Sequence, residues 1–235
     1  YSLKKKVRVP NAGAIAAAYG SVSAVTFVTA VSFLENQGVD FGGHMVAIMA
    51  IMESPAIIVG VILIMLFDKT KTSKSSMGSV IKHSFTSGSV LMLIGSLIIG
   101  LIADATQARG IEPFTTDIFK GFLALFLLEM GMVTAKRIKG FKKYGWSLFL
   151  FAIIIPLVNG LITAYLSGFI TDSDGNRFLF AILGAGASYI AVPATMKLAE
   201  PRADAGIYIP MALGITFPFN ITIGMPLYYA FIQMT

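Results

Sequence analysis

Long apolar segments alternate with short polar connectors along the whole chain. An α-helix rises about 1.5 Å per residue, so roughly 20 apolar residues cross the hydrocarbon core of a bilayer. Segments of about that length lie at 11–34, 42–67, 84–103, 116–135, 144–170, 178–197 and 206–233. The pattern predicts an all-α polytopic membrane protein in which this chain supplies about seven spans.

The connectors between these segments alternate in charge. One group holds 15 of the 18 Lys and Arg residues and consists of 1–10, 68–83, 136–143 and 197–204. The other group holds 3 basic residues and 7 of the 12 acids, and consists of 35–40, 104–120 and 171–177. Because cytoplasmic loops are enriched in Lys and Arg, we predict a multi-pass protein of the cell inner (plasma) membrane whose C-terminus lies outside.

The overall composition agrees with a membrane protein and excludes several other classes. The chain is 56% hydrophobic and 13% charged, whereas about a quarter of the residues in soluble domains are charged. It has no cysteine, so disulfides and cysteine-based metal sites are excluded. Neither His44 nor His83 has a partner at metal-ligand spacing, and no nucleophile–base constellation appears. We therefore expect no enzyme and no organic cofactor. The net charge of +6 belongs to the connectors and does not indicate nucleic acid.

Two of the apolar segments are interrupted by small and polar residues. Gly20–Thr26 lies inside 11–34, and Gly186–Thr195, which contains a proline, lies inside 178–197. Irregular backbone at membrane depth is tolerated only where it is buried in protein or lines a wet cavity. A pair of such interruptions indicates broken helices and the substrate site of a transporter. The alternative is that the small residues only allow close helix packing.

The two interruptions begin similar segments. In each, a serine precedes a glutamate by 12 residues, Glu35 or Glu200, and a proline follows 20 or 18 residues later inside the next span. Three spans separate the copies, so the period is five, and an odd period inverts the second copy. The predicted division is the end of a first repeat (1–67), a cytoplasmic linker (68–83) and a second five-span repeat (84–235). It also predicts three spans upstream of Tyr1. Chance similarity among apolar segments is the alternative.

The hydroxyls and the flexible backbone of the interruptions are the candidate substrate ligands. They are Gly20, Ser21, Ser23, Thr26, Gly186, Ser188 and Thr195. Half-helix N-termini present free N–H groups and positive dipole ends, which bind a small anion without Lys or Arg. Carbonyls and hydroxyls of the same breaks can coordinate a cation, so Ser23 and Ser188 are also candidate ion ligands.

Glu53 lies near the middle of the segment 42–67. An ionisable side chain at that depth costs about 2.5 kcal/mol or more and marks a functional site by default. We interpret Glu53 as a residue that binds or tunes the coupling cation. The alternative is a glutamate that only bonds across helices or faces a watery vestibule.

These residues resemble the sodium-dependent bicarbonate permease family, the cyanobacterial-type Na⁺/HCO₃⁻ symporters. The fragments that carry the likeness are Gly20-Ser21-Val22-Ser23 with Thr26 and Leu34-Glu35, Met52–Ala56, Met130-Gly131-Met132 with Arg137-Ile138, Pro156–Gly160, then Ser188, Pro193, Thr195, Gly214, Pro218 and Gly224–Leu227. Each fragment is short, so the specificity lies in their order and spacing. At the second break, known members carry a Ser-rich run ending in Asp, where this chain has Gly186–Tyr189. At the first break, they carry Gly and Ser, where this chain has Ala24 and Val25.

The resemblance implies two inverted five-helix repeats with core and gate domains, of which this chain covers spans four to ten. It implies a homotrimer in membrane lipid, with bicarbonate as substrate and Na⁺ as coupling ion. A cytoplasmic PII-like regulator is a further possible partner, although the linker 68–83 is short. We therefore expect Na⁺-coupled symport of bicarbonate by alternating access. The alternatives are another small anion, an H⁺-coupled carrier using Glu53, or a channel or non-transporting receptor with the same fold.

Overall fold

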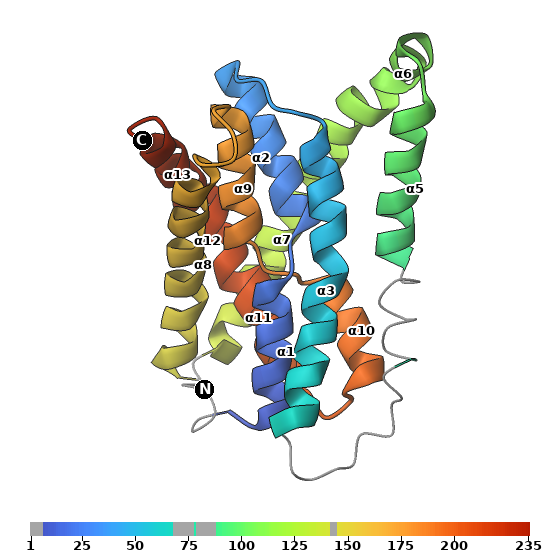
Figure 1. Ribbon diagram of the computed structural model, residues 1–235. Helices are drawn as coiled ribbons and strands as arrows, with labels where there is room; N and C mark the ends of the chain where they lie inside the picture. Colours follow the sequence, from blue (N-terminus) through green and yellow to red (C-terminus); the bar gives the residue numbers. More distant parts are fainter. Residues whose placement is uncertain (1–6, 68–77, 79–87, 142–144) are drawn as a thin grey trace.

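The computed structural model describes residues 7–67, 78, 88–141 and 145–235, and these residues form helices and no strand (Figure 1). Each predicted apolar segment is mostly helical where the chain is described, and two of them are interrupted by non-helical residues, 21–23 and 186–190. The all-α class is confirmed.

The first segment is a helix in two pieces. α1 (Val9–Gly20) ends before Ser21, and α2 (Ala24–Gln37) continues in the same general direction (Figure 1). Gly38 ends α2 with φ at +67°, a left-handed conformation that glycine adopts without a steric penalty. The chain then returns through α3 (His44–Phe67), which contains Pro55.

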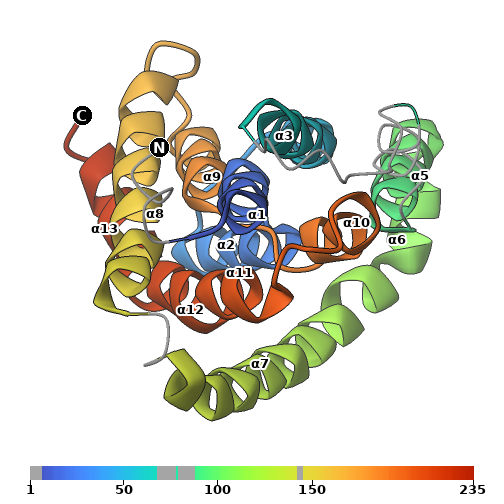
Figure 2. The same ribbon diagram turned by 90° about the horizontal axis from the view of Figure 1, so that it is seen from below.

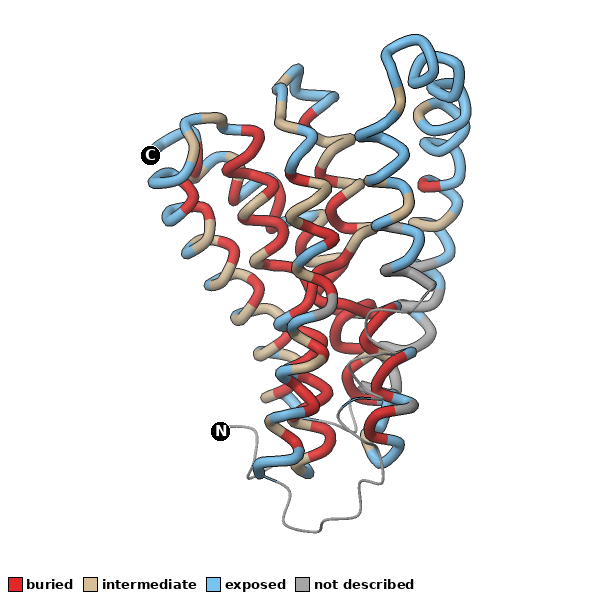
Figure 3. The backbone as a smooth tube through the Cα atoms, turned by 45° about the vertical axis from the view of Figure 1, so that its right-hand side comes forward, coloured by how far each residue is buried: buried red, intermediate tan, exposed pale blue. Residues whose placement is uncertain are grey.

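The middle of the chain forms an arm along one side of the bundle. It consists of α5 (Gly88–Ile102), α6 (Ala105–Glu112), the π-helix η2 (Pro113–Ile118) and α7 (Phe119–Phe141). Figure 2 shows α7 running along the outside of α11 and α12, with α5 and α6 beyond α10. Much of α5 and α6 is exposed (Figure 3).

The last part of the chain completes the bundle. α8 (Trp146–Ser167) contains Pro156, and a second broken helix follows as α9 (Asp174–Ala185) and α10 (Ala191–Ala199). The final rod consists of α11 (Ala205–Met211), η3 (Ala212–Thr216), α12 (Phe217–Phe219), η4 (Asn220–Gly224) and α13 (Met225–Ile232). Its two π-helical stretches precede Pro218 and Pro226, where proline cannot donate a helical hydrogen bond.

Four described helical segments are long and apolar enough to cross a membrane. They are Val9–Gln37, His44–Phe67, Trp146–Ser167 and Ala205–Ile232. Of the other predicted spans, α5 has 15 residues, and the segment 178–197 is divided between helices of 12 and 9 residues. The count of seven spans and the inverted repeat therefore stay predictions.

The buried apolar residues form two clusters, and both draw on the beginning and the end of the chain. One joins α1 to α10, α11 and η3, and the other joins α2 to α9 and α13. Both clusters thus combine residues from before and after the linker, and the predicted division into two repeats stays a prediction. The linker 68–83 lies outside the described residues, except for residue 78.

The connectors sort to the two ends of the bundle. The acid-rich connectors after α2, around α6 and before α9 lie at one end together with the C-terminus, the upper end in Figure 1. The start of α1 and the turn between α10 and α11 lie at the opposite end.

Candidate functional site

The first helix break places three polar side chains in a buried turn. The Ser21 amide completes α1 by donating to the Ala17 carbonyl (3.1 Å), and the Ser21 hydroxyl donates to the Glu53 carbonyl (3.0 Å). Ser23 is the N-cap of α2, where its Oγ accepts from the Thr26 amide (3.2 Å) and the Thr26 hydroxyl (2.8 Å). Because Ser23 Oγ is the acceptor in both bonds, its own hydroxyl hydrogen remains available to a third group.

The second break crosses the first in direct contact. The Ser188 amide donates to the Ala18 carbonyl at 2.8 Å, although 170 residues separate them in sequence. A Cβ at Gly186 would lie 3.3 Å from the Ser23 amide nitrogen and 3.3 Å from the Leu183 carbonyl oxygen. Gly186 has an ordinary φ of −67°, so the position favours glycine because of space.

The crossing brings two helix N-termini together. In Figure 1, α1 and α2 run in the direction opposite to α9 and α10, so both α2 and α10 begin at the centre of the bundle. Ser23 is 7% exposed and Ser188 is 3% exposed. The free N–H groups and positive dipole ends of α2 and α10 therefore lie away from bulk solvent, an arrangement suited to an anion.

Ile190 is the N-cap of α10, but Ser188 also bonds to the first turn of this helix. Its Oγ accepts from the Val192 amide at 3.3 Å. Thr195 is buried on α10 with no hydrogen bond to the other candidates, and Gly20 is an exposed residue at the end of α1. The structure thus groups Ser21, Ser23, Thr26, Gly186 and Ser188, but it does not join Thr195 to them.

Glu53 is buried, 6% exposed, on the face of α3 beside the first break. Its backbone carbonyl receives the Ser21 hydroxyl, and one turn further along α3, Ala56 lies 3.4 Å from where a Cβ at Gly20 would be. Its proximity to the break agrees with the predicted ion site, and its role as a ligand stays a prediction.

Asn220 and Tyr228 support the second break from the final rod. The Asn220 side-chain amide donates to the Ala185 carbonyl, the last of α9, at 2.7 Å. The Tyr228 hydroxyl lies 3.3 Å from Asn220 Oδ1 and 3.2 Å from the Pro156 carbonyl oxygen. The side chain of Asn220 thus satisfies a carbonyl that the end of a helix leaves without a partner.

Thr216 and Tyr19 support the crossing from the other side. Pro156 has no N–H, so the Ala152 carbonyl one turn earlier lacks its helical donor. The Thr216 hydroxyl donates to that carbonyl at 2.7 Å, and the Tyr19 hydroxyl lies 2.8 Å from Thr216 Oγ1. Because Thr216 has one hydrogen, Tyr19 is the donor between the two.

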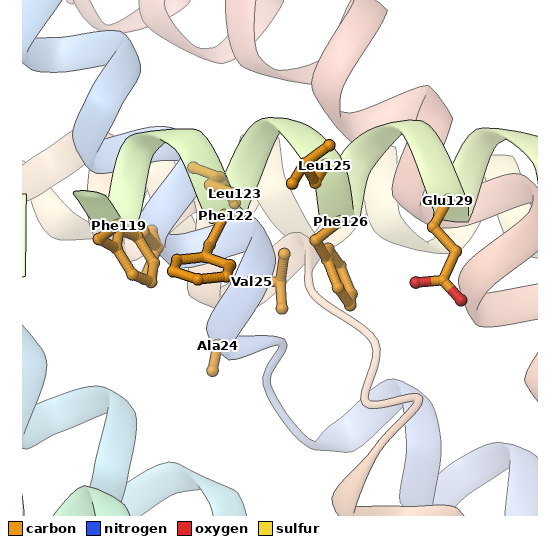
Figure 4. A pocket seen from close by; sticks show the side chains of 9 residues that line it. Ala24, Val25, Phe119, Phe122, Leu123, Leu125, Phe126 and Glu129 are labelled. Carbon is orange, nitrogen blue, oxygen red and sulfur yellow. The ribbon is translucent and has the colours of Figure 1, made fainter. Parts of the chain in front are cut away.

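A pocket of about 540 Å³ opens between the start of α2 and α7 (Figure 4). Ala24 and Val25 form its wall on α2, and Phe119, Phe122 and Phe126 line it from α7. Glu129 is the acidic residue at its far end. Since Ala24 follows Ser23 directly, this largely apolar pocket lies beside the first break.

Tyr189 lies at the crossing and is not among the residues that the sequence predicts as ligands. It is 8% exposed, and its ring packs on Phe217 with centroids 5.5 Å apart. Its hydroxyl lies toward Ser23 and Thr26 of the first break, but no hydrogen bond of normal geometry joins it to any described residue. The sequence places Tyr189 in the second break but carries no signal of where the side chain points. Tyr19, Thr216 and Asn220 were also not predicted as supports.

Within the described residues, no group of three His, Asp or Glu side chains gathers as a metal site. Any cation at the crossing would depend on hydroxyl and backbone oxygens, with Glu53 as the nearby carboxyl group.

Comparison with known protein families gives one match over nearly the whole chain. The model of the Na⁺-dependent bicarbonate transporter superfamily matches residues 1–233. A comparison with curated proteins gives no match.

Proposed function

Because the chain belongs to the Na⁺-dependent bicarbonate transporter superfamily, we propose that it carries bicarbonate across a membrane together with Na⁺, by alternating access. The crossing of the two broken helices is the observation that carries the proposal. Ser188 N lies 2.8 Å from the Ala18 carbonyl oxygen, so the second break is joined to the last turn of α1, directly before the first break.

The proposed anion site uses neutral donors. The amides of Ala24 and Val25 belong to the first turn of α2, where a helix leaves N–H groups without an intrahelical acceptor. The Ser23 hydroxyl adds a donor, and the start of α10 adds a second positive dipole end. A binding site without a fixed cation can release its anion more easily than a buried Lys or Arg would, which suits a carrier.

The proposed Na⁺ site uses oxygen atoms of the same breaks. α1 and α9 end where α2 and α10 begin, so carbonyl ends of helices also face the crossing, and such ends coordinate Na⁺ in transporters with broken helices. Glu53, buried beside Ser21, would bind the cation or tune its affinity. A site for each ion at one crossing provides a physical route for coupling, because each bound charge favours the other.

The pocket beside α2 supports a moving interface. Three phenylalanines of α7 face Ala24 and Val25 across it (Figure 4). Apolar surfaces can slide or separate without breaking hydrogen bonds, so we propose that the arm containing α7 moves relative to the broken helices during transport. A homotrimer in membrane lipid and a PII-like regulator remain proposals from the family resemblance.

Uptake of labelled bicarbonate by the full-length protein in proteoliposomes tests this function. We expect uptake with an inward Na⁺ gradient and none when K⁺ replaces Na⁺. Uptake driven instead by a pH gradient and abolished by Glu53→Gln would favour the H⁺-coupled carrier. Flux of bicarbonate without dependence on either gradient would indicate a channel. Folded protein without bicarbonate flux would direct the test to other small anions, and a lack of flux for all of them would favour a receptor.

A further inference from the structure

The hydroxyl of Tyr189 is buried at the helix crossing without a hydrogen-bond partner. Buried polar atoms are nearly always paired, because leaving one unpaired forfeits its hydration without compensation. Such an atom in a protein that binds a ligand therefore indicates where the ligand completes the bonding.

The position of the hydroxyl is fixed by its surroundings. The Tyr189 ring packs on Phe217 at an interplanar angle of 70°, and the residue lies in the break immediately before α10. Its hydroxyl faces Ser23 and Thr26 at the start of α2. The Ser23 hydroxyl hydrogen is also unused, because Ser23 Oγ accepts both bonds from Thr26.

Several hydrogen-bond donors face this point. They comprise the Tyr189 and Ser23 hydroxyls and the first-turn amides of α2, which lack intrahelical acceptors. Ser23 and Tyr189 come from the two different breaks. A small oxyanion presents several acceptor oxygens, so it can accept hydrogen bonds from both breaks at once. A water molecule could also accept hydrogen bonds from these donors, but it lacks the negative charge that strengthens them.

We propose that the Tyr189 hydroxyl donates a hydrogen bond directly to the transported anion, and that Tyr189 makes the site selective for small oxyanions. The proposal rests on the proposed function for the position of the site. The anion joins Tyr189 of the second break to Ser23 of the first, so its binding also tightens the crossing.

Tyr189→Phe is the direct test, because it keeps the ring on Phe217 and removes only the donor. Hydrogen bonds to charged groups are among the stronger ones, so we expect the Kd for bicarbonate to rise at least about tenfold. The melting temperature of the anion-free protein should stay equal or increase, because the unpaired hydroxyl is gone. Tyr165→Phe is the matched control, since Tyr165 is exposed on α8, and it should change neither quantity.

The measurement is the thermal stability of the purified full-length protein at fixed Na⁺, titrated separately with bicarbonate, formate, nitrate and chloride. The proposal predicts that oxyanions stabilise the wild-type protein at lower concentrations than Tyr189→Phe, with a smaller difference for chloride. Equal titration midpoints in both proteins, or no stabilisation of the wild-type protein by any of these anions, would overturn it. So would a Tyr189→Phe protein that is clearly less stable without anion, because the hydroxyl would then have a partner in the protein.

Transport separates this inference from the proposed function. Na⁺-driven uptake with the same KM in wild type and Tyr189→Phe would overturn the role of Tyr189 and leave the symporter intact. Oxyanion binding that depends on Tyr189, without Na⁺-driven uptake, would support the inference and overturn the symporter. A change confined to the Na⁺ half-saturation concentration would assign the hydroxyl to the cation and overturn the proposal.

Discussion

At the scale of single residues, the helix crossing depends on serines that accept hydrogen bonds from the helices that follow them. Ser23 and Ser188 each accept a bond from an amide in the first turn of the following helix. A capping serine uses only its lone pairs for this, so the hydroxyl hydrogen can still serve a ligand. In the proposed site the same side chain would contribute to stability and to binding, so a test of its function must separate the two.

A comparison of Ser23→Ala with Ser173→Ala separates the contribution to stability from the contribution to binding. Ser173 caps α9 through the Asn176 amide, at the end of the bundle that holds the C-terminus. Each substitution removes one N-cap and should lower the free energy of unfolding by about 1 kcal/mol. Only Ser23→Ala should also raise the KM for uptake, which is measured in proteoliposomes with matched protein density. A comparable increase in both variants would mean that Ser23 acts through stability alone.

Gly186→Ala tests how closely the two breaks must approach. The added Cβ would lie 3.3 Å from the Ser23 amide nitrogen and the Leu183 carbonyl oxygen, so the breaks must move apart by a few tenths of an ångström. We expect a several-fold loss of uptake and a lower melting temperature. Gly110→Ala is the control, because a Cβ there meets nothing within 4 Å on the exposed helix α6, where alanine favours the helix. Uptake equal to wild type in Gly186→Ala would show that the close approach is not required.

At the scale of elements, the sequence predicts the broken helices well because glycines, hydroxyls and a proline interrupt apolar segments of spanning length. It also predicts a buried Glu53 in the middle of a span, but not that Glu53 lies beside the first break. It does not predict the supports. The hydrogen bond from Thr216 to the Ala152 carbonyl forms only because two helices distant in sequence meet at Pro156. The direction of the Tyr189 side chain toward Ser23 arises in irregular backbone. Neither the periodicity of a helix nor that of a strand predicts side-chain directions there.

Thr216→Val tests the support at Pro156. The substitution keeps the shape of the side chain but leaves the buried Ala152 carbonyl and the Tyr19 hydroxyl unpaired, so it should lower the free energy of unfolding by about 1–3 kcal/mol. In a Pro156→Ala background, the new amide at position 156 can donate to the Ala152 carbonyl, and Thr216→Val should then cost less. A double-mutant cycle of thermal or denaturant unfolding in detergent measures this coupling. Strict additivity would show that Thr216 does not compensate for the proline.

At the scale of the whole molecule, the two broken helices run in opposite directions and the charged connectors gather at opposite ends (Figure 1). Both broken helices contribute to both apolar clusters, through α1 and α10 in one and α2 and α9 in the other. A site at the crossing therefore lies between the ends of the bundle and can be reached from either, provided that neighbouring elements such as α7 move. This geometry is what alternating access needs, and it makes the orientation in the membrane a testable part of the function.

Labelling of single cysteines tests that orientation, since the 235 residues contain no cysteine of their own. Gln233 and Pro201 are exposed and lie at opposite ends of the bundle. Basic connectors remain in the cytoplasm, so a membrane-impermeant maleimide should label Gln233→Cys in intact cells and Pro201→Cys only after the cells are permeabilised. The unsubstituted protein measures background labelling. The reverse result would place the C-terminus in the cytoplasm, and the face from which bicarbonate and Na⁺ enter would then have to be assigned to the other end of the bundle.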